Sequence, residues 1–153
     1  MTKGKGTKVN KKQYWFWAEI ALFYTYKDKV NTKNPSGFLD RQFLLVVATN
    51  HQRAFKKFHS ICKSFDTSKS KTSELLLDDK PGVCFALGII NFGICMDRVD
   101  SLISNRKRAL NYAEITYAKS NCTKAKAFKL IPSQDKLLRN VSEEVNQSGY
   151  AFQ

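Results

Sequence analysis

The chain has 153 residues, with 26 Lys and Arg against 13 Asp and Glu, and it therefore carries a formal net charge of +13. Hydrophobic residues make up 42% of the chain, whereas Gly and Pro number only 7 and 3. This composition excludes an intrinsically disordered chain, a linker and a fibrous repeat. The length suits one folded domain, which we place at residues 14–153, after a basic arm at residues 1–13.

The basic arm contains five lysines, two glycines and no acidic residue. It lacks the apolar side chains that form a core, so we expect it to be flexible. Basic arms of this kind often follow the phosphates of a nucleic acid. The candidate contacts in the arm are Lys8, Lys11 and Lys12.

The aromatic segment that follows, residues 14–29, predicts a helix in which Phe16, Ile20 and Phe23 share one side. A strand is the competing interpretation, because aromatic residues also favour strands. Residues 31–37 contain Asn, Pro and Gly, which is typical of a turn.

Residues 37–66 show the clearest helical periodicity, because apolar residues recur at intervals of three and four. The pattern predicts either one long helix or two helices joined near residues 49–50. Ser36 is a plausible N-cap for this helix. A polar loop at residues 66–73 and a short element at residues 74–79 follow.

Residues 83–96 form the longest apolar run and predict a buried central helix, in which Gly88 and Gly93 permit close packing. A core strand stays open as an alternative, because periodicity does not separate the two structures in a run of this kind. Residues 97–119 predict a further helix.

A last helix is expected between Ser133, its N-cap, and Gly149, just past its end. Its apolar stripe consists of Leu137, Leu138, Val141 and Val145. In sum, the sequence predicts a mainly α fold: a single compact domain of about five helices with a flexible basic N-terminal arm.

The positive charge is concentrated in residues 1–13, 36–66 and 106–139, which together hold more than the whole net charge. Lysine outnumbers arginine, which favours contact with phosphates over the reading of base edges. The candidate nucleic-acid contacts in the third segment are Arg106, Arg108, Lys124 and Lys126.

Within the second segment, residues 51–65 place apolar residues on one side of a predicted helix. The opposite side has no acidic residue, although Glu–Lys pairs at i, i+4 would stabilise a helix that only faced solvent. Contact with phosphates restores that lost stabilisation and makes binding strongly dependent on salt. The candidate contacts on this side are Arg53, Lys56, Lys57 and Lys63.

Aromatic residues next to the basic arm offer a second mode of binding, namely stacking on unpaired bases. The residues concerned are Tyr14, Trp15, Trp17 and Tyr26. An aromatic run of this density more often forms core, so core is the favoured interpretation.

Candidate catalytic and metal-binding groups are sparse. His59 and Cys62 lie three residues apart on a predicted helix, but no second pair has the spacing of a zinc site. Asp97 and Asp100 have the spacing to hold Mg²⁺, but a negative charge at Asp97 also suits the start of a helix. We therefore expect no enzyme activity, no metal and no cofactor.

The four cysteines form no C-x-x-C pair, so we expect reduced thiols and a cytoplasmic protein. The N-terminal segment lacks a small-residue cleavage site and is not interpreted as a signal peptide. The apolar run at residues 83–96 is too short to span a bilayer, so no membrane partner is expected.

Taken together, these features predict a non-catalytic nucleic-acid-binding protein, an accessory or regulatory factor that contacts phosphates and prefers double-stranded DNA to RNA. The alternative is a protein-interaction module, an accessory or inhibitory subunit that docks on an acidic protein or a nucleoprotein complex. The Lys- and Asn-rich composition suits a phage or plasmid origin. Homodimerisation, common among proteins that bind DNA through helices, is left open.

Overall fold

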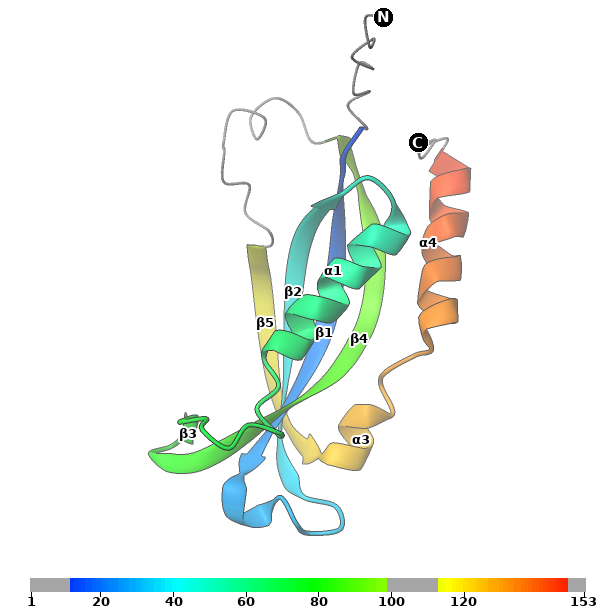
Figure 1. Cartoon of the computed structure of the whole chain (residues 1–153). Helices are drawn as coiled ribbons and strands as arrows, with labels where there is room; N and C mark the ends of the chain where they lie inside the picture. The colour runs from blue at the N-terminus through cyan, green and yellow to red at the C-terminus, as the bar shows by residue number, and fades with distance from the viewer. Residues whose placement is uncertain (1–11, 99–112, 149–153) are drawn as a thin grey trace, which may run out of the picture.

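A five-stranded antiparallel sheet dominates the computed structural model, which describes residues 12–98 and 113–148 (Figure 1). The strand order is β3-β4-β1-β2-β5, so the first strand of the sequence lies in the middle of the sheet. The strands are β1 (Tyr14–Tyr26), β2 (Ser36–Ala48), β3 (Leu76–Leu77), β4 (Lys80–Arg98) and β5 (Ala113–Thr123). The helices are α1 (His51–Ser64), α3 (Lys124–Phe128) and α4 (Gln134–Ser148), with one 3-10 turn, η1 (Lys27–Lys29).

The predicted mainly α fold of about five helices is wrong, because the most apolar segments of the chain are strands. The aromatic run forms β1, and the first half of the periodic segment 37–66 lies in β2. Ser36, predicted as a helix N-cap, is the first residue of β2. The predicted central helix at residues 83–96 lies within β4.

The predicted helix at residues 97–119 is also corrected where the structure describes it. Its first two residues belong to β4, and residues 113–119 belong to β5. The remainder of that prediction, residues 99–112, lies outside the described residues.

Two helix positions are confirmed. Helix α1 begins directly after the joint predicted at residues 49–50, and the Asn50 side chain accepts a hydrogen bond from the Arg53 backbone N–H at 2.9 Å. Helix α4 follows Ser133, whose hydroxyl oxygen accepts from the Lys136 backbone N–H at 3.3 Å. No helix in the described ranges is long and apolar enough to cross a bilayer.

The centre of β1 explains why the sequence pattern favoured a helix. Residues 18–23 are all buried, on both faces of the sheet. A strand covered on both sides is apolar at consecutive positions and loses the alternation of a half-exposed strand. Such a run cannot be told from a buried helix by periodicity.

Bulges in β4 had a similar effect on the sequence pattern. Glu19 pairs with Asn91, whereas the next residue of β1, Ile20, pairs with Ile89, so Ile90 is an extra residue in β4. A second shift leaves Leu87 as another extra residue. Each bulge interrupts the alternation of side chains between the two faces, so the period of two that marks a strand is lost in this run.

The main core lies on the face of the sheet that α1 and α4 cover (Figure 1). Phe55 and Phe58 of α1 both meet the ring of Phe92 on β4 edge to face, with ring centres 5.7 Å and 5.8 Å apart. Helix α4 adds Leu137 and Val141, both buried. These contacts fix the orientation of α1 on the sheet.

A smaller core lies on the opposite face, at the end of the sheet where β2 begins. There Ala127 of α3 packs with Ala21, Phe23 and Leu39. Helices α1 and α3 therefore cover opposite faces of the sheet.

Asp66 ties the loop after α1 to β4. Its carboxylate accepts hydrogen bonds from the backbone N–H of Ala86 at 2.8 Å and of Ser68 at 2.9 Å. Partial burial acts to raise the pKa of Asp66, but the hydrogen bonds from Ser68 and Ala86, with Lys69 nearby, outweigh it and lower the pKa below 3.8. The ionised carboxylate is thus the form that suits the folded state.

The stability that Asp66 contributes is expected to be present above about pH 4 and to disappear as the pH falls through the lowered pKa of the folded state. Asp66→Asn should therefore lower the free energy of unfolding at about pH 7 and differ less from the wild type at about pH 3. Urea denaturation of both proteins at the two pH values measures this. An equal difference at both would contradict the role given to the carboxylate.

Candidate nucleic-acid interface

Helix α1 presents one apolar side to the sheet and one basic side to solvent. Its buried residues are Ala54, Phe55, Phe58 and Cys62. They recur at intervals of three and four, so the residues between them point away from the core. The amphipathic division predicted for residues 51–65 is therefore present in the structure.

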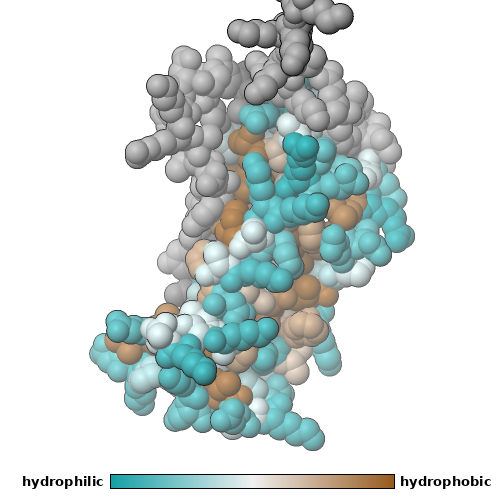
Figure 2. Space-filling model, viewed as in Figure 1, coloured by the Kyte–Doolittle hydropathy of each residue, from teal (hydrophilic) through white to brown (hydrophobic). Residues whose placement is uncertain are grey.

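The outward side of α1 carries a row of exposed cations that we call the α1 basic face. It consists of Arg53, Lys56, Lys57 and Lys63. Spacings of three, four and ten residues keep these side chains on one side of the helix. The helix has no acidic residue, and Figure 2 shows mostly hydrophilic side chains over it. The charged residues of the α1 basic face are thus all positive.

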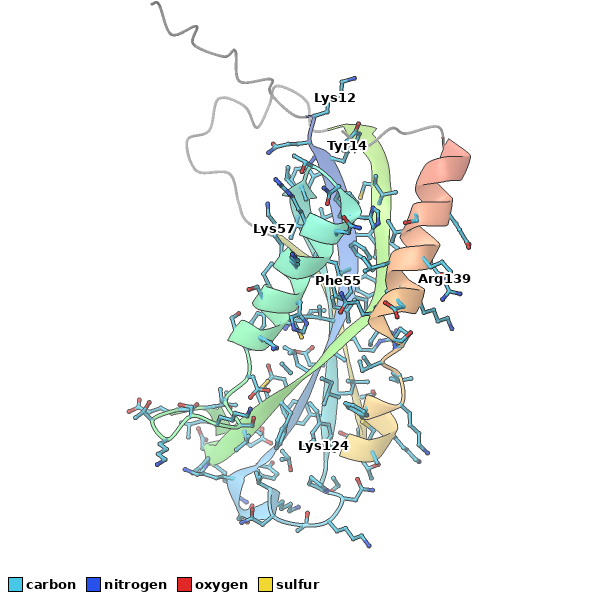
Figure 3. The ribbon with its side chains drawn as sticks, turned by 45° about the vertical axis from the view of Figure 1, so that its right-hand side comes forward. Lys12, Tyr14, Phe55, Lys57, Lys124 and Arg139 are labelled. Atoms are coloured by element: carbon cyan, nitrogen blue, oxygen red, sulfur yellow. The ribbon has the colours of Figure 1, made fainter. Side chains whose placement is uncertain are left out.

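One lysine of the α1 basic face forms a hydrogen bond within the fold. The Lys57 ammonium donates a hydrogen bond to the backbone carbonyl of Val47, near the end of β2, at 2.5 Å. Figure 3 labels Lys57 on α1 beside the sheet. Arg53, Lys56 and Lys63 form no ion pair with any described side chain. These three residues are therefore the free cations of the α1 basic face.

Of the predicted arm contacts, only Lys12 is a described residue. It is exposed and lies just before β1, at the end of the sheet where β2 finishes and α1 begins (Figure 3). Lys8 and Lys11 lie outside the described residues, as do Arg106 and Arg108. The structure thus brings Lys12 to the same end of the sheet as Arg53.

The lysines of α3 lie elsewhere. Lys124 and Lys126 belong to a short helix at the other end of the sheet and on its other face (Figure 3). The Lys124 ammonium stands 3.7 Å from the ring centre of Phe85, so part of its charge faces an aromatic ring. The structure therefore does not join these two lysines to the α1 basic face.

A cavity of about 540 Å³ lies beside Tyr26, at the end of the sheet where β1 finishes. The ammonium groups of Lys29 and Lys80 stand 5.6 Å and 5.7 Å from the centre of the Tyr26 ring. The Tyr26 hydroxyl donates to Asp78 at 3.0 Å, and this bond raises the pKa of Tyr26. Because Asp28 also lines the cavity, its charge is mixed and suits phosphates less than the α1 basic face does.

Sequence reasoning did not find this cavity. Tyr26 and Lys29 are close in the sequence, but Lys80 is the first residue of the distant strand β4. Only the register of β1 with β4, in which Tyr26 pairs with Gly82, brings Lys80 to the ring. No local pattern in the sequence signals that pairing.

The structure describes several of the groups that the sequence offered for metal binding and catalysis. In residues 12–98 and 113–148, no three His, Cys, Asp or Glu side chains gather as a metal site requires. Burial raises the pKa of Cys62 to about 11 and that of Cys84 to about 12, which makes both thiols poor nucleophiles. Asp97 lies in β4 and not at the start of a helix, and Asp100 is outside the described residues.

Comparison with known proteins identifies no relative of this chain. No family model matches it, and neither a curated protein nor a solved structure matches it. Its function is therefore inferred from the residues and geometry of the α1 basic face.

Proposed function

We propose that this protein binds nucleic acid without catalysing a reaction, and that it contacts the phosphates of double-stranded DNA through the α1 basic face. The observation that carries this proposal is the row of exposed cations on α1, on a helix without a single acidic residue. A duplex phosphate backbone supplies the opposite charge that the helix itself lacks. Each phosphate that a Lys or Arg neutralises releases close to one counterion, which favours binding at low salt.

The spacing of the free cations supports contact with more than one phosphate. Arg53 and Lys63 are ten residues apart, which is about 15 Å along a helix. That length exceeds the width of the major groove, about 12 Å, so α1 is long enough to contact phosphates on both sides of it. Lysine, a point charge on a flexible stem, suits such phosphate contacts.

A cytoplasmic setting forms part of the proposal. Cys62, Cys84 and Cys122 are free thiols in the structure. Free thiols persist in a reducing compartment, whereas an oxidising one favours disulfides.

The test is reversal of charge on α1. The variant Lys56→Glu with Lys63→Glu is expected to lose most of its affinity for a DNA duplex, because two phosphate contacts become repulsive. Fluorescence anisotropy of a labelled duplex over a series of salt concentrations measures this. For the wild type we expect a steep fall of affinity with salt, and for the variant a slope shallower by about 2.

The matched control carries the same change of net charge far from α1. Lys27 and Lys33 are exposed residues at the other end of the sheet, at or near the turn between β1 and β2. Lys27→Glu with Lys33→Glu should leave duplex binding close to that of the wild type. Equal losses in both variants would show that only net charge matters, and no duplex binding at low salt would contradict the proposal. The melting temperature of each variant should stay close to that of the wild type, because all four side chains are exposed.

A further inference from the structure

Both tryptophans of the chain point to the face of the sheet opposite α1 and α4. Trp15 and Trp17 alternate in β1 with the buried Tyr14, Phe16 and Ala18, which belong to the main core. Successive side chains of a strand point to opposite faces, so the two indoles face away from that core. They are partly exposed.

The neighbours of these tryptophans define what we call the tryptophan face. Residues that pair directly on neighbouring strands share a face of the sheet. Trp17 pairs with Leu45 on β2, and Glu19 pairs with Phe43 on β2 and with Asn91 on β4. The tryptophan face consists of Trp15, Trp17, Arg41, Phe43, Leu45 and Asn91. Helix α3 covers the other end of this side of the sheet, and no described helix covers the tryptophan face.

Gly93 holds the indole of Trp17 in place. A Cβ atom at position 93 would lie 2.5 Å from Nε1 and 2.6 Å from Cε2 of Trp17, so the ring rests directly against the glycine backbone. A ring fixed in this way loses little conformational freedom when a ligand stacks on it, which favours binding.

Glu19 holds Arg41 in place. The Glu19 side chain is 1% exposed, and its Oε1 accepts from the Arg41 guanidinium while its Oε2 accepts from the Asn91 amide at 2.7 Å. Both carboxylate oxygens are thus occupied, and the negative charge is paired. The Arg41 side chain remains 41% exposed, and a guanidinium has five N–H donors, so some are left for a ligand.

We propose that the tryptophan face binds a single strand of nucleic acid, with unpaired bases stacked on Trp15, Trp17 and Phe43 and with Arg41 donating to a base edge or a phosphate. The ligand class rests on the proposed function, but the site is separate from the α1 basic face and lies on the other side of the sheet. Stacking on aromatic side chains tolerates any base, and stacking of bases on the aromatic side chains of a β-sheet is a known mode of single-strand recognition.

The chemistry of the face favours bases over an apolar protein partner. Its end nearest α3 is polar, because Arg41 and Asn91 lie between the aromatic residues and the part of the sheet that α3 covers. Among the described side chains of this face, the only acid is Glu19, which is already paired. The aromatic rings and the fixed hydrogen-bond donors beside them match the bases of the ligand. The net charge of +13 on the chain matches its phosphate backbone.

Tryptophan fluorescence of the full chain tests the proposal directly, because the chain has two tryptophans and both lie on this face. An oligothymidylate of about 12 nucleotides is expected to quench the emission at low salt. A blunt duplex of the same length should quench it far less, because its bases are already stacked in pairs. No quenching by the oligothymidylate, or equal quenching by the duplex, would overturn the proposal.

Three variants test whether the oligothymidylate binds at Trp17. Trp17→Ala should raise the Kd for the oligothymidylate about tenfold, and Trp17→Phe should restore most of the affinity. Gly93→Ala adds a methyl group where the indole rests and should weaken binding without a change of charge. If Trp17→Ala proves too unstable to assay, Gly93→Ala decides the matter, with its melting temperature as the check on folding. Unchanged affinity in Gly93→Ala, or in a folded Trp17→Ala, would overturn the assignment.

The same experiments distinguish single-strand binding on the tryptophan face from duplex binding on the α1 basic face. Lys56→Glu with Lys63→Glu should remove most of the affinity for the duplex and leave the quenching by oligothymidylate in place. Quenching without duplex binding in the wild type would remove the α1 proposal and support this one. Duplex binding without quenching would do the reverse.

Discussion

Replacing Phe58 with alanine is expected to lower the free energy of unfolding by about 3–5 kcal/mol. Phe58 is fully buried, and its ring meets that of Phe92 edge to face with centres 5.8 Å apart. The substitution leaves a cavity between α1 and β4, which the neighbouring side chains can fill only in part. Urea denaturation followed by circular dichroism measures the loss.

The matched control is the same substitution at Phe128, which is 60% exposed at the end of α3. Phe128→Ala should change the free energy of unfolding by no more than about 0.5 kcal/mol. Similar losses in both variants would mean that α1 does not pack on β4 as the structure shows.

Replacing Arg41 with alanine is expected to cost about 3 kcal/mol, because it leaves the carboxylate of Glu19 buried with only Asn91 as its partner. Much of this cost comes from the unpaired charge and not from the loss of the pair itself. Adding Glu19→Gln to Arg41→Ala removes that charge and should recover a large part of the stability. Denaturant midpoints of the single and double variants measure the recovery.

Arg53→Ala serves as the control for the loss of an arginine. Arg53 is exposed and pairs with no described acid, so its removal should leave stability within about 0.5 kcal/mol of the wild type. A double variant no more stable than Arg41→Ala alone would mean that the buried carboxylate is not the source of the cost.

The parts of the structure that the sequence predicted well depend on neighbours a few residues apart. Helix α1 and its division into a core side and a basic side follow from spacings of three and four, although the same spacings in residues 37–48 belong to strand β2. The last helix also follows from its cap at Ser133 and its apolar stripe. For these elements the local pattern and the final packing agree.

The parts that the sequence missed depend on pairing between distant segments. Residues 18–23 of β1 are buried on both faces because cores lie on both sides of the sheet, and neither core is visible within residues 14–29. The bulge at Ile90 has meaning only against the register of β1. The grouping of Glu19, Arg41 and Asn91 likewise comes from three strands that are far apart in the chain.

The position of β1 in the middle of the sheet has a consequence for synthesis of the chain. The hairpin of β1 and β2 can form as soon as both have emerged, but Phe55 and Phe58 of α1 must wait for their packing partner Phe92, which lies late in β4. A nascent chain that ends after α1 therefore keeps the contacts of α1 with β1 and β2 but lacks those with β4. Such a chain exposes apolar side chains of α1 and should be a target for chaperones until translation has passed β4.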